Sequence, residues 1–81
     1  SYIAGLKAGG LDRLAQKIGE EAVETVIAAK NARKDLLDVE AADLLFHLLV
    51  LLKAKGSSLA RVADVLRRRH RGSAVPDDAV L

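Results

Sequence analysis

Cysteine is absent from this 81-residue sequence, which excludes disulfides, thiolate nucleophiles and zinc–thiolate sites. Aromatic residues are also scarce, since the chain has one tyrosine, Tyr2, and one phenylalanine, Phe46. Its only proline is Pro76. Leucine and alanine dominate what remains, and both favour helices. The sequence therefore predicts one small all-α domain with an aliphatic core.

The sequence shows no signal peptide and no apolar stretch long enough to span a bilayer. Its longest apolar run covers residues 41–52, which is too short to cross a membrane as a helix. We therefore expect a cytoplasmic protein without a membrane partner.

A basic run, Arg67-Arg68-Arg69-His70-Arg71, precedes Gly72. Interleaved aromatic residues and nucleic-acid recognition motifs are missing, so we expect no nucleic-acid partner. The run either complements the helix dipole at a solvated helix end or contributes to binding the phosphates of a substrate.

Apolar residues repeat at helical spacing in three segments, which predicts helices over residues 11–31, 34–55 and 58–70. A shorter helix is expected to end near Lys7, because Ala8-Gly9-Gly10 follows it. Gly56 suits the C-terminal cap of the middle helix. We expect an antiparallel helical bundle in one domain, residues 1–72, followed by a loose tail over residues 73–81.

Residues 41–52 are apolar on nearly every side, which is typical of a buried helix. A core this small is marginal for a single chain. We therefore predict that a homodimer completes the bundle. The residues expected in the bundle or subunit core are Leu45, Phe46, Leu49 and Leu52.

Five acids form the pattern E-E-x-x-E and, after a gap of fifteen residues, E-x-x-D: Glu20, Glu21, Glu24, Glu40 and Asp43. At about 100° per residue, the first three share one helix face, and Lys17 points into the same arc. The other two can face them if the helices run antiparallel. Converging carboxylates repel one another unless a cation lies among them, and Mg²⁺ prefers oxygen ligands.

Within residues 41–52 only Asp43 and His47 are not apolar, and together with Glu40 they form one narrow polar stripe on this helix. Buried carboxylates are costly unless they are paired or bound to a metal, so the stripe is expected to face something specific. His47 orients a carboxylate, contacts a substrate, or is a satisfied core residue.

Two segments, KIGEEAVETVIAAKN at residues 17–31 and EAADLLFHLLVLL at residues 40–52, resemble the phosphoribosyl-ATP pyrophosphohydrolases of histidine biosynthesis. The opening SYIA, the following GGLD and the late RRRH are similar to that family as well, so the resemblance covers residues 1–71. The acidic motifs alone would indicate only the wider MazG-like group of all-α nucleoside triphosphate pyrophosphohydrolases.

The resemblance implies a dimeric all-α enzyme that uses Mg²⁺, or Mn²⁺ as a substitute, to hydrolyse phosphoribosyl-ATP to phosphoribosyl-AMP and pyrophosphate. The implied metal ligands are Glu21, Glu24, Glu40 and Asp43. Glu20 would be a further ligand or would position the water, so the expected catalytic residues are Glu20 and Glu21. The expected substrate-binding residues are Lys17, Lys30, Asn31 and His47.

The sequence departs from that family at several points. Members usually begin with a further helix and loop before the S-Y pair, with which this sequence begins. Phe46 stands where Tyr is frequent, so a hydroxyl role there is lost or was never needed, and Val39 stands where a second acid is common. The segment after Gly72 matches no pattern of the family.

Two other functions stay open. The chain is either a MazG-like enzyme for another nucleotide, such as dUTP or a damaged triphosphate, or a non-enzymatic helical dimerisation module whose acids are polar filler. A substrate panel separates the two enzymes, and the dimerisation module predicts no specific binding of divalent cations.

Overall fold

The computed structural model describes residues 2–71, apart from the side chains of residues 6 and 7. All regular structure in this range is helical, with α1 (Tyr2–Ala8), α2 (Gly10–Lys30), α3 (Lys34–Ala54) and α4 (Leu59–Arg71). The all-α prediction is confirmed, and the three longer predicted helices match the observed ones to within one residue at each end. The tail predicted over residues 73–81 lies outside the described residues.

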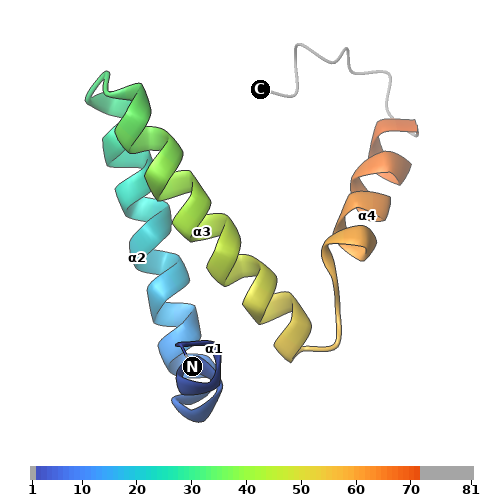
Figure 1. Ribbon diagram of the computed structural model, residues 1–81. Coiled ribbons are helices and arrows are strands. Elements are labelled where there is room, and N and C mark those ends of the chain that lie inside the picture. The colour runs from blue at the N-terminus through green and yellow to red at the C-terminus, as the bar shows by residue number, and fades with distance from the viewer. Residues whose placement is uncertain (1, 72–81) are drawn as a thin grey trace.

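The helices α2 and α3 form an antiparallel hairpin, as predicted (Figure 1). The short helix α1 packs against α2 at the end of the hairpin where α2 begins and α3 ends. Within residues 2–71, only these two pairs of helices pack extensively, and α4 leads away from the hairpin (Figure 1). The hairpin therefore places one face of α2 directly opposite one face of α3.

The predicted cap at Gly56 is confirmed and has the hydrogen bonds of a Schellman motif. Gly56 adopts a φ of 75°, which costs glycine little because it has no Cβ atom. Its N–H donates to the carbonyl of Lys53 at 3.1 Å, and the N–H of Ser57 donates to the carbonyl of Leu52 at 2.7 Å. This motif ends α3 and turns the chain towards α4.

The core of the single chain is small. Leu14 of α2 and Val50 of α3 are buried against each other, with Ile18 and Leu51 packed around them. Most other large apolar side chains on the hairpin stay partly or largely open to solvent. None of the described helices is both long and apolar enough to cross a membrane.

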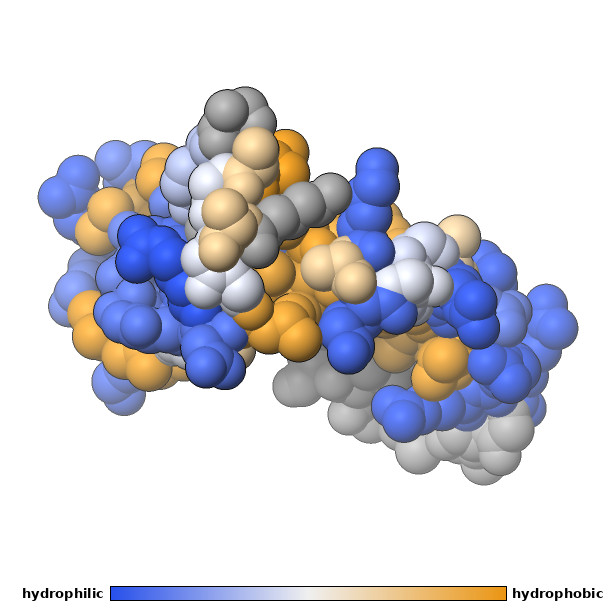
Figure 2. All heavy atoms as spheres, turned by 90° about the horizontal axis from the view of Figure 1, so that it is seen from below, coloured by the Kyte–Doolittle hydropathy of each residue, from blue (hydrophilic) through white to orange (hydrophobic). Residues whose placement is uncertain are grey.

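Exposed apolar surface lies between the α2–α3 hairpin and α4, with hydrophilic surface on the outer side of α4 (Figure 2). Of the residues predicted for the core, Leu49 and Leu52 are half-buried within the chain. Leu45 is 49% exposed and Phe46 is 39% exposed. The single chain therefore covers part of the apolar circumference of α3 and leaves the rest open.

Candidate functional site

Four of the five predicted site acids come together across the hairpin, two from α2 and two from α3. The pKa of the Glu40 carboxyl on α3 is raised, first by a hydrogen bond with Glu24 of α2 and then by desolvation. The negative charges of Glu24, Asp43 and Glu21 raise it further. Because all three charges act on one carboxyl, the two acidic patches face each other. The helical period predicted this for helices that run antiparallel.

Two carboxylate oxygens in this cluster are buried without a hydrogen-bond partner, Oε1 of Glu21 and Oε2 of Glu40. Glu21 Oε1 lies 2.6 Å from Nδ1 of His47, yet the pair lacks hydrogen-bond geometry. That nitrogen instead makes a hydrogen bond with the main-chain carbonyl of Asp43 at 2.9 Å. A buried carboxylate oxygen without a hydrogen bond is costly, and a nearby cation would offset that cost.

The donor set fits a hard divalent cation in its chemistry. It consists of carboxylate oxygens that repel one another, two of them buried and open to a partner. In residues 2–71, no group of three or more His, Asp or Glu side chains has the arrangement of a formed metal site. Coordination of one ion therefore requires side-chain rotations, which the exposed positions of Glu24 and Asp43 permit.

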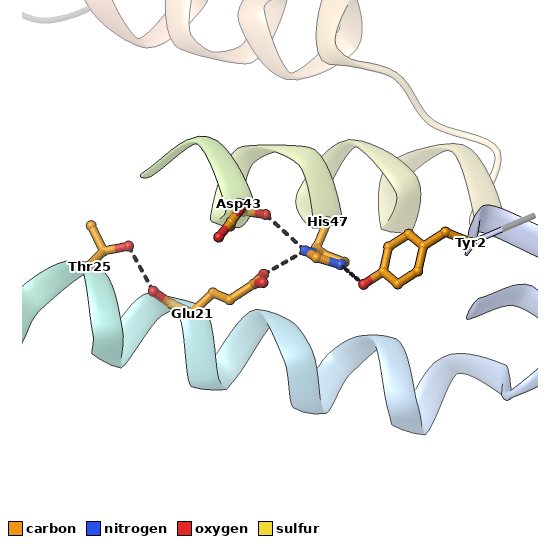
Figure 3. Close-up of polar contacts among 5 residues, drawn as sticks. All are labelled: Tyr2, Glu21, Thr25, Asp43 and His47. Atoms are coloured by element: carbon orange, nitrogen blue, oxygen red, sulfur yellow. Dashed lines mark hydrogen bonds and ion pairs between the residues drawn. The ribbon is translucent and has the colours of Figure 1, made fainter. Parts of the chain in front are cut away.

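His47 is enclosed at the centre of this face and is only 5% exposed (Figure 3). The hydroxyl of Tyr2, from α1, lies 2.5 Å from its Nε2. Since Nδ1 already contacts Asp43 and Glu21, both ring nitrogens are directed at protein atoms. This arrangement matches the first alternative for His47, orientation of a carboxylate, more closely than contact with a substrate.

The remaining predicted site residues lie around the acidic cluster. Glu20 is exposed on α2 and is not among the groups that raise the pKa of Glu40. Lys17 is half-buried one turn nearer the start of α2. Lys30 and Asn31 are exposed at the tip of the hairpin, about 9 Å or more along the helix axis from Glu24. Their roles stay predictions.

The basic run of α4 is solvated. Arg67 and Arg68 pair with Asp64 at 3.5 Å and 3.2 Å, and all three side chains are more than half exposed. In this chain α4 stands apart from the hairpin that carries the acids (Figure 1). The structure therefore matches a helix end whose charge complements the helix dipole.

Sequence reasoning missed Tyr2, which it counted only as an apolar residue of the first helix. The structure places its hydroxyl against His47, which is 45 positions away in the sequence. The available signal was its rarity, since Tyr2 is the only tyrosine in a chain with a single phenylalanine and no tryptophan.

Comparison with known proteins gives consistent matches across this region. A family model described as phosphoribosyl-ATP pyrophosphohydrolase matches residues 1–70, which contain all five acids. Phosphoribosyl-ATP pyrophosphatase of Erythrobacter litoralis is 52% identical over 79 residues, which are 98% of this chain and 76% of that protein. The protein of the same name from Zymomonas mobilis is 56% identical over 69 residues, which are 85% of this chain and 64% of that protein.

A bifunctional protein also matches. The histidine biosynthesis bifunctional protein HisIE of Xylella fastidiosa is 52% identical over 71 residues, which are 88% of this chain and 34% of that protein. The matched unit thus occurs both as most of a shorter protein and as about a third of a longer one.

Proposed function

This chain belongs to the phosphoribosyl-ATP pyrophosphohydrolase family, and we propose that it hydrolyses phosphoribosyl-ATP to phosphoribosyl-AMP and pyrophosphate, a step of histidine biosynthesis. The observation that carries the proposal is the acidic cluster of the α2–α3 hairpin, which lies wholly inside the matched residues. A hydrolase for a polyphosphate needs cations to offset the charge of its substrate, and clustered carboxylates are suited to hold such cations. A cytoplasmic location is part of the same proposal.

Dependence on Mg²⁺, with Mn²⁺ as a substitute, belongs to the proposal. The residues that would hold the ion are Glu21, Glu24, Glu40 and Asp43. When bound, Mg²⁺ offsets the negative charge of the polyphosphate and acts as a Lewis acid at phosphorus. The support is the raised pKa of Glu40 and the two buried oxygens that lack hydrogen bonds.

Residues of the chain supply the base that activates the water and the positive groups that offset charge on the phosphates. A carboxylate, Glu20 or Glu21, takes a proton from water as the water oxygen bonds to phosphorus. The bond from phosphorus to the pyrophosphate oxygen breaks in line with that attack, and its electron pair leaves with pyrophosphate. Lys17 precedes the cluster by one turn of α2, and Lys30 and Asn31 lie at the tip of the hairpin. In this proposal the two lysines offset charge on the phosphates.

The substrate panel that tests this proposal compares pyrophosphate release from phosphoribosyl-ATP with release from ATP, dUTP and oxidised triphosphates. We expect phosphoribosyl-ATP to have the highest kcat/KM in the presence of Mg²⁺. A clear preference for another triphosphate would contradict the proposal and support the MazG-like alternative. No release from any nucleotide, together with no Mg²⁺ binding in titration calorimetry, would support the dimerisation module.

We also propose that the chain acts as a homodimer. The support is the apolar surface that one chain leaves open, including Val23, Val26 and Ile27 of α2 and Leu45 and Phe46 of α3. With Leu14 and Val50 as its main buried pair, a single chain removes little apolar surface from water to offset the entropy of folding.

Leu45→Lys tests the dimer, because it puts a charge on apolar surface of α3 that is 49% exposed in the single chain. Full burial of a leucine contributes about 1.5–3 kcal/mol, so the open half of Leu45 contributes about half of that, and a symmetric dimer loses it twice. The dissociation constant should therefore rise about 10- to 10²-fold in sedimentation equilibrium. Asp38→Asn changes the net charge equally at an exposed polar position of α3 and should leave it unchanged. A wild type that is stable, active and monomeric at micromolar concentration would contradict the proposal.

A further inference from the structure

We propose that Tyr2 and His47 are positioning residues for the Glu21 carboxylate. The three side chains form a continuous polar chain that starts on α1, passes through α3 and ends on α2 (Figure 3). The inference deepens the proposed function and rests on it, since Glu21 matters as a ligand or base only if the acidic cluster is the active site.

The imidazole of His47 is held in place by ring packing. The chain has only two aromatic residues, and both contact this histidine. The ring centroid of Tyr2 lies 5.7 Å from that of His47, with the planes at 77°. The Phe46 centroid lies 5.1 Å away, at 80°. Tyr2 and Phe46 in turn stack at 6.1 Å, so the two rings fix each other as well as the imidazole plane.

The partners of His47 determine where its proton resides. Nδ1 faces a carbonyl oxygen of Asp43 and a carboxylate oxygen of Glu21, and both of these atoms only accept hydrogen bonds. Nδ1 must therefore carry a proton. Nε2 faces the Tyr2 hydroxyl, which can donate to it when the ring is neutral. The two acceptors therefore select the Nδ1–H tautomer, and the hydroxyl satisfies the remaining nitrogen, Nε2. Phe46 has no hydroxyl, so only Tyr2 supplies one in this ring cluster.

The Nδ1–H tautomer in turn holds the carboxylate of Glu21 in position. Glu21 is 8% exposed, so its side chain has little room to move into solvent. With a proton on Nδ1, the positive edge of the imidazole faces Oε1 at 2.6 Å. Without the Tyr2 hydroxyl, Nε2 loses its partner, and the imidazole is held only by ring packing and by the Asp43 carbonyl. Loss of the hydroxyl should therefore loosen the imidazole and, with it, the carboxylate of Glu21.

Imidazole NMR of the ¹⁵N-labelled, metal-free protein tests which ring nitrogen of His47 carries the proton and whether Tyr2 contacts the other one. The exposed His70 on α4 serves as internal reference. We expect a proton on Nδ1 of His47 in the wild type and in Tyr2→Phe, with a shifted Nε2 resonance in Tyr2→Phe because that nitrogen loses its hydrogen bond. Phe46→Leu is the matched control, because it loosens the ring packing and keeps the hydroxyl, so the hydrogen bond to Nε2 should persist. An unprotonated Nδ1 in the wild type, or an unchanged ring in Tyr2→Phe, would overturn the inference whatever the protein hydrolyses.

Mg²⁺ titration calorimetry tests whether the imidazole of His47 positions the carboxylate of Glu21. Residues that orient a metal ligand typically contribute about 10- to 100-fold to metal affinity, so Tyr2→Phe should weaken Mg²⁺ binding within that range. His47→Asn keeps an N–H donor near the position of Nδ1, whereas His47→Gln places its donor near Nε2. The Asn variant should therefore retain more affinity than the Gln variant, although both lose the same ring.

The outcomes separate the inference from the function on which it rests. If the wild type binds Mg²⁺ and all three variants bind it equally well but melt at lower temperature, Tyr2 and His47 only stabilise the fold, and the inference is overturned. If the wild type neither binds Mg²⁺ nor releases pyrophosphate, the proposed function fails. The inference would then fail as a statement about a catalytic site, even where the NMR result supports the polar chain from Tyr2 to Glu21.

Discussion

Glu21→Gln should lower kcat/KM for phosphoribosyl-ATP by about 10²- to 10⁴-fold, the range that general-base catalysis typically contributes. Glutamine keeps the shape of the side chain and removes its charge. At this position the carboxylate is 8% exposed, and Oε1 lies 2.6 Å from Nδ1 of His47. The variant should also bind Mg²⁺ more weakly, because one anionic oxygen ligand is replaced by a neutral one.

The control for this prediction is Asp38→Asn, which removes a carboxylate charge at an exposed position outside the cluster. It should keep the kcat/KM of the wild type. A Glu21→Gln enzyme within tenfold of the wild type, with unchanged Mg²⁺ affinity, would show that Glu21 is neither base nor ligand. In that case Glu20→Gln becomes the informative variant, because Glu20 is the other acid of the pair on α2.

The sequence was sufficient to predict the helices because the signals that start and end them are local. The apolar period of α2 and α3 and the glycines at positions 9, 10 and 56 each act within a turn or two of their own position. The convergence of Glu24 and Asp43 was predictable for a related reason. A short connection makes α2 and α3 antiparallel, and the helical period then decides which side chains face each other.

The contact between Tyr2 and His47 was beyond sequence reasoning. It joins residues 45 positions apart on helices whose relative placement no periodicity fixes. What buries the apolar side chains of α3 was predictable only in part. A nearly complete apolar circumference indicates that Leu45 and Phe46 need cover, yet it does not say which chain provides it. In the single chain both remain more than a third exposed.

Glu40→Gln should raise the melting temperature of the metal-free protein at neutral pH and remove most of its stabilisation by Mg²⁺. The pKa of Glu40 is raised by its hydrogen bond with Glu24, by desolvation and by the charges of Glu24, Asp43 and Glu21. The folded protein therefore holds this proton more tightly than the unfolded chain does. The resulting contribution to stability is fully present below the ordinary pKa of 4.5 and is lost as the pH rises through the folded pKa. Glutamine resembles the protonated acid at every pH. The variant should therefore be more stable than the wild type at a pH above the folded pKa of Glu40, and equally stable at a pH below 4.5.

Mg²⁺ should reverse the balance, because an ion that binds only the folded cluster would stabilise the wild type by about 2.7 kcal/mol at a concentration 100 times its Kd. Glu40→Gln, and likewise Asp43→Asn, should lose most of this gain together with turnover. Asp38→Asn should behave as the wild type in both conditions. Thermal melts of the four proteins with and without Mg²⁺, at pH 4 and pH 7, measure the predicted changes in stability, and pyrophosphate release measures turnover. If these acids instead pair with a basic group, their removal leaves that charge unpaired, and the variants would be destabilised without metal while their response to Mg²⁺ stays that of the wild type.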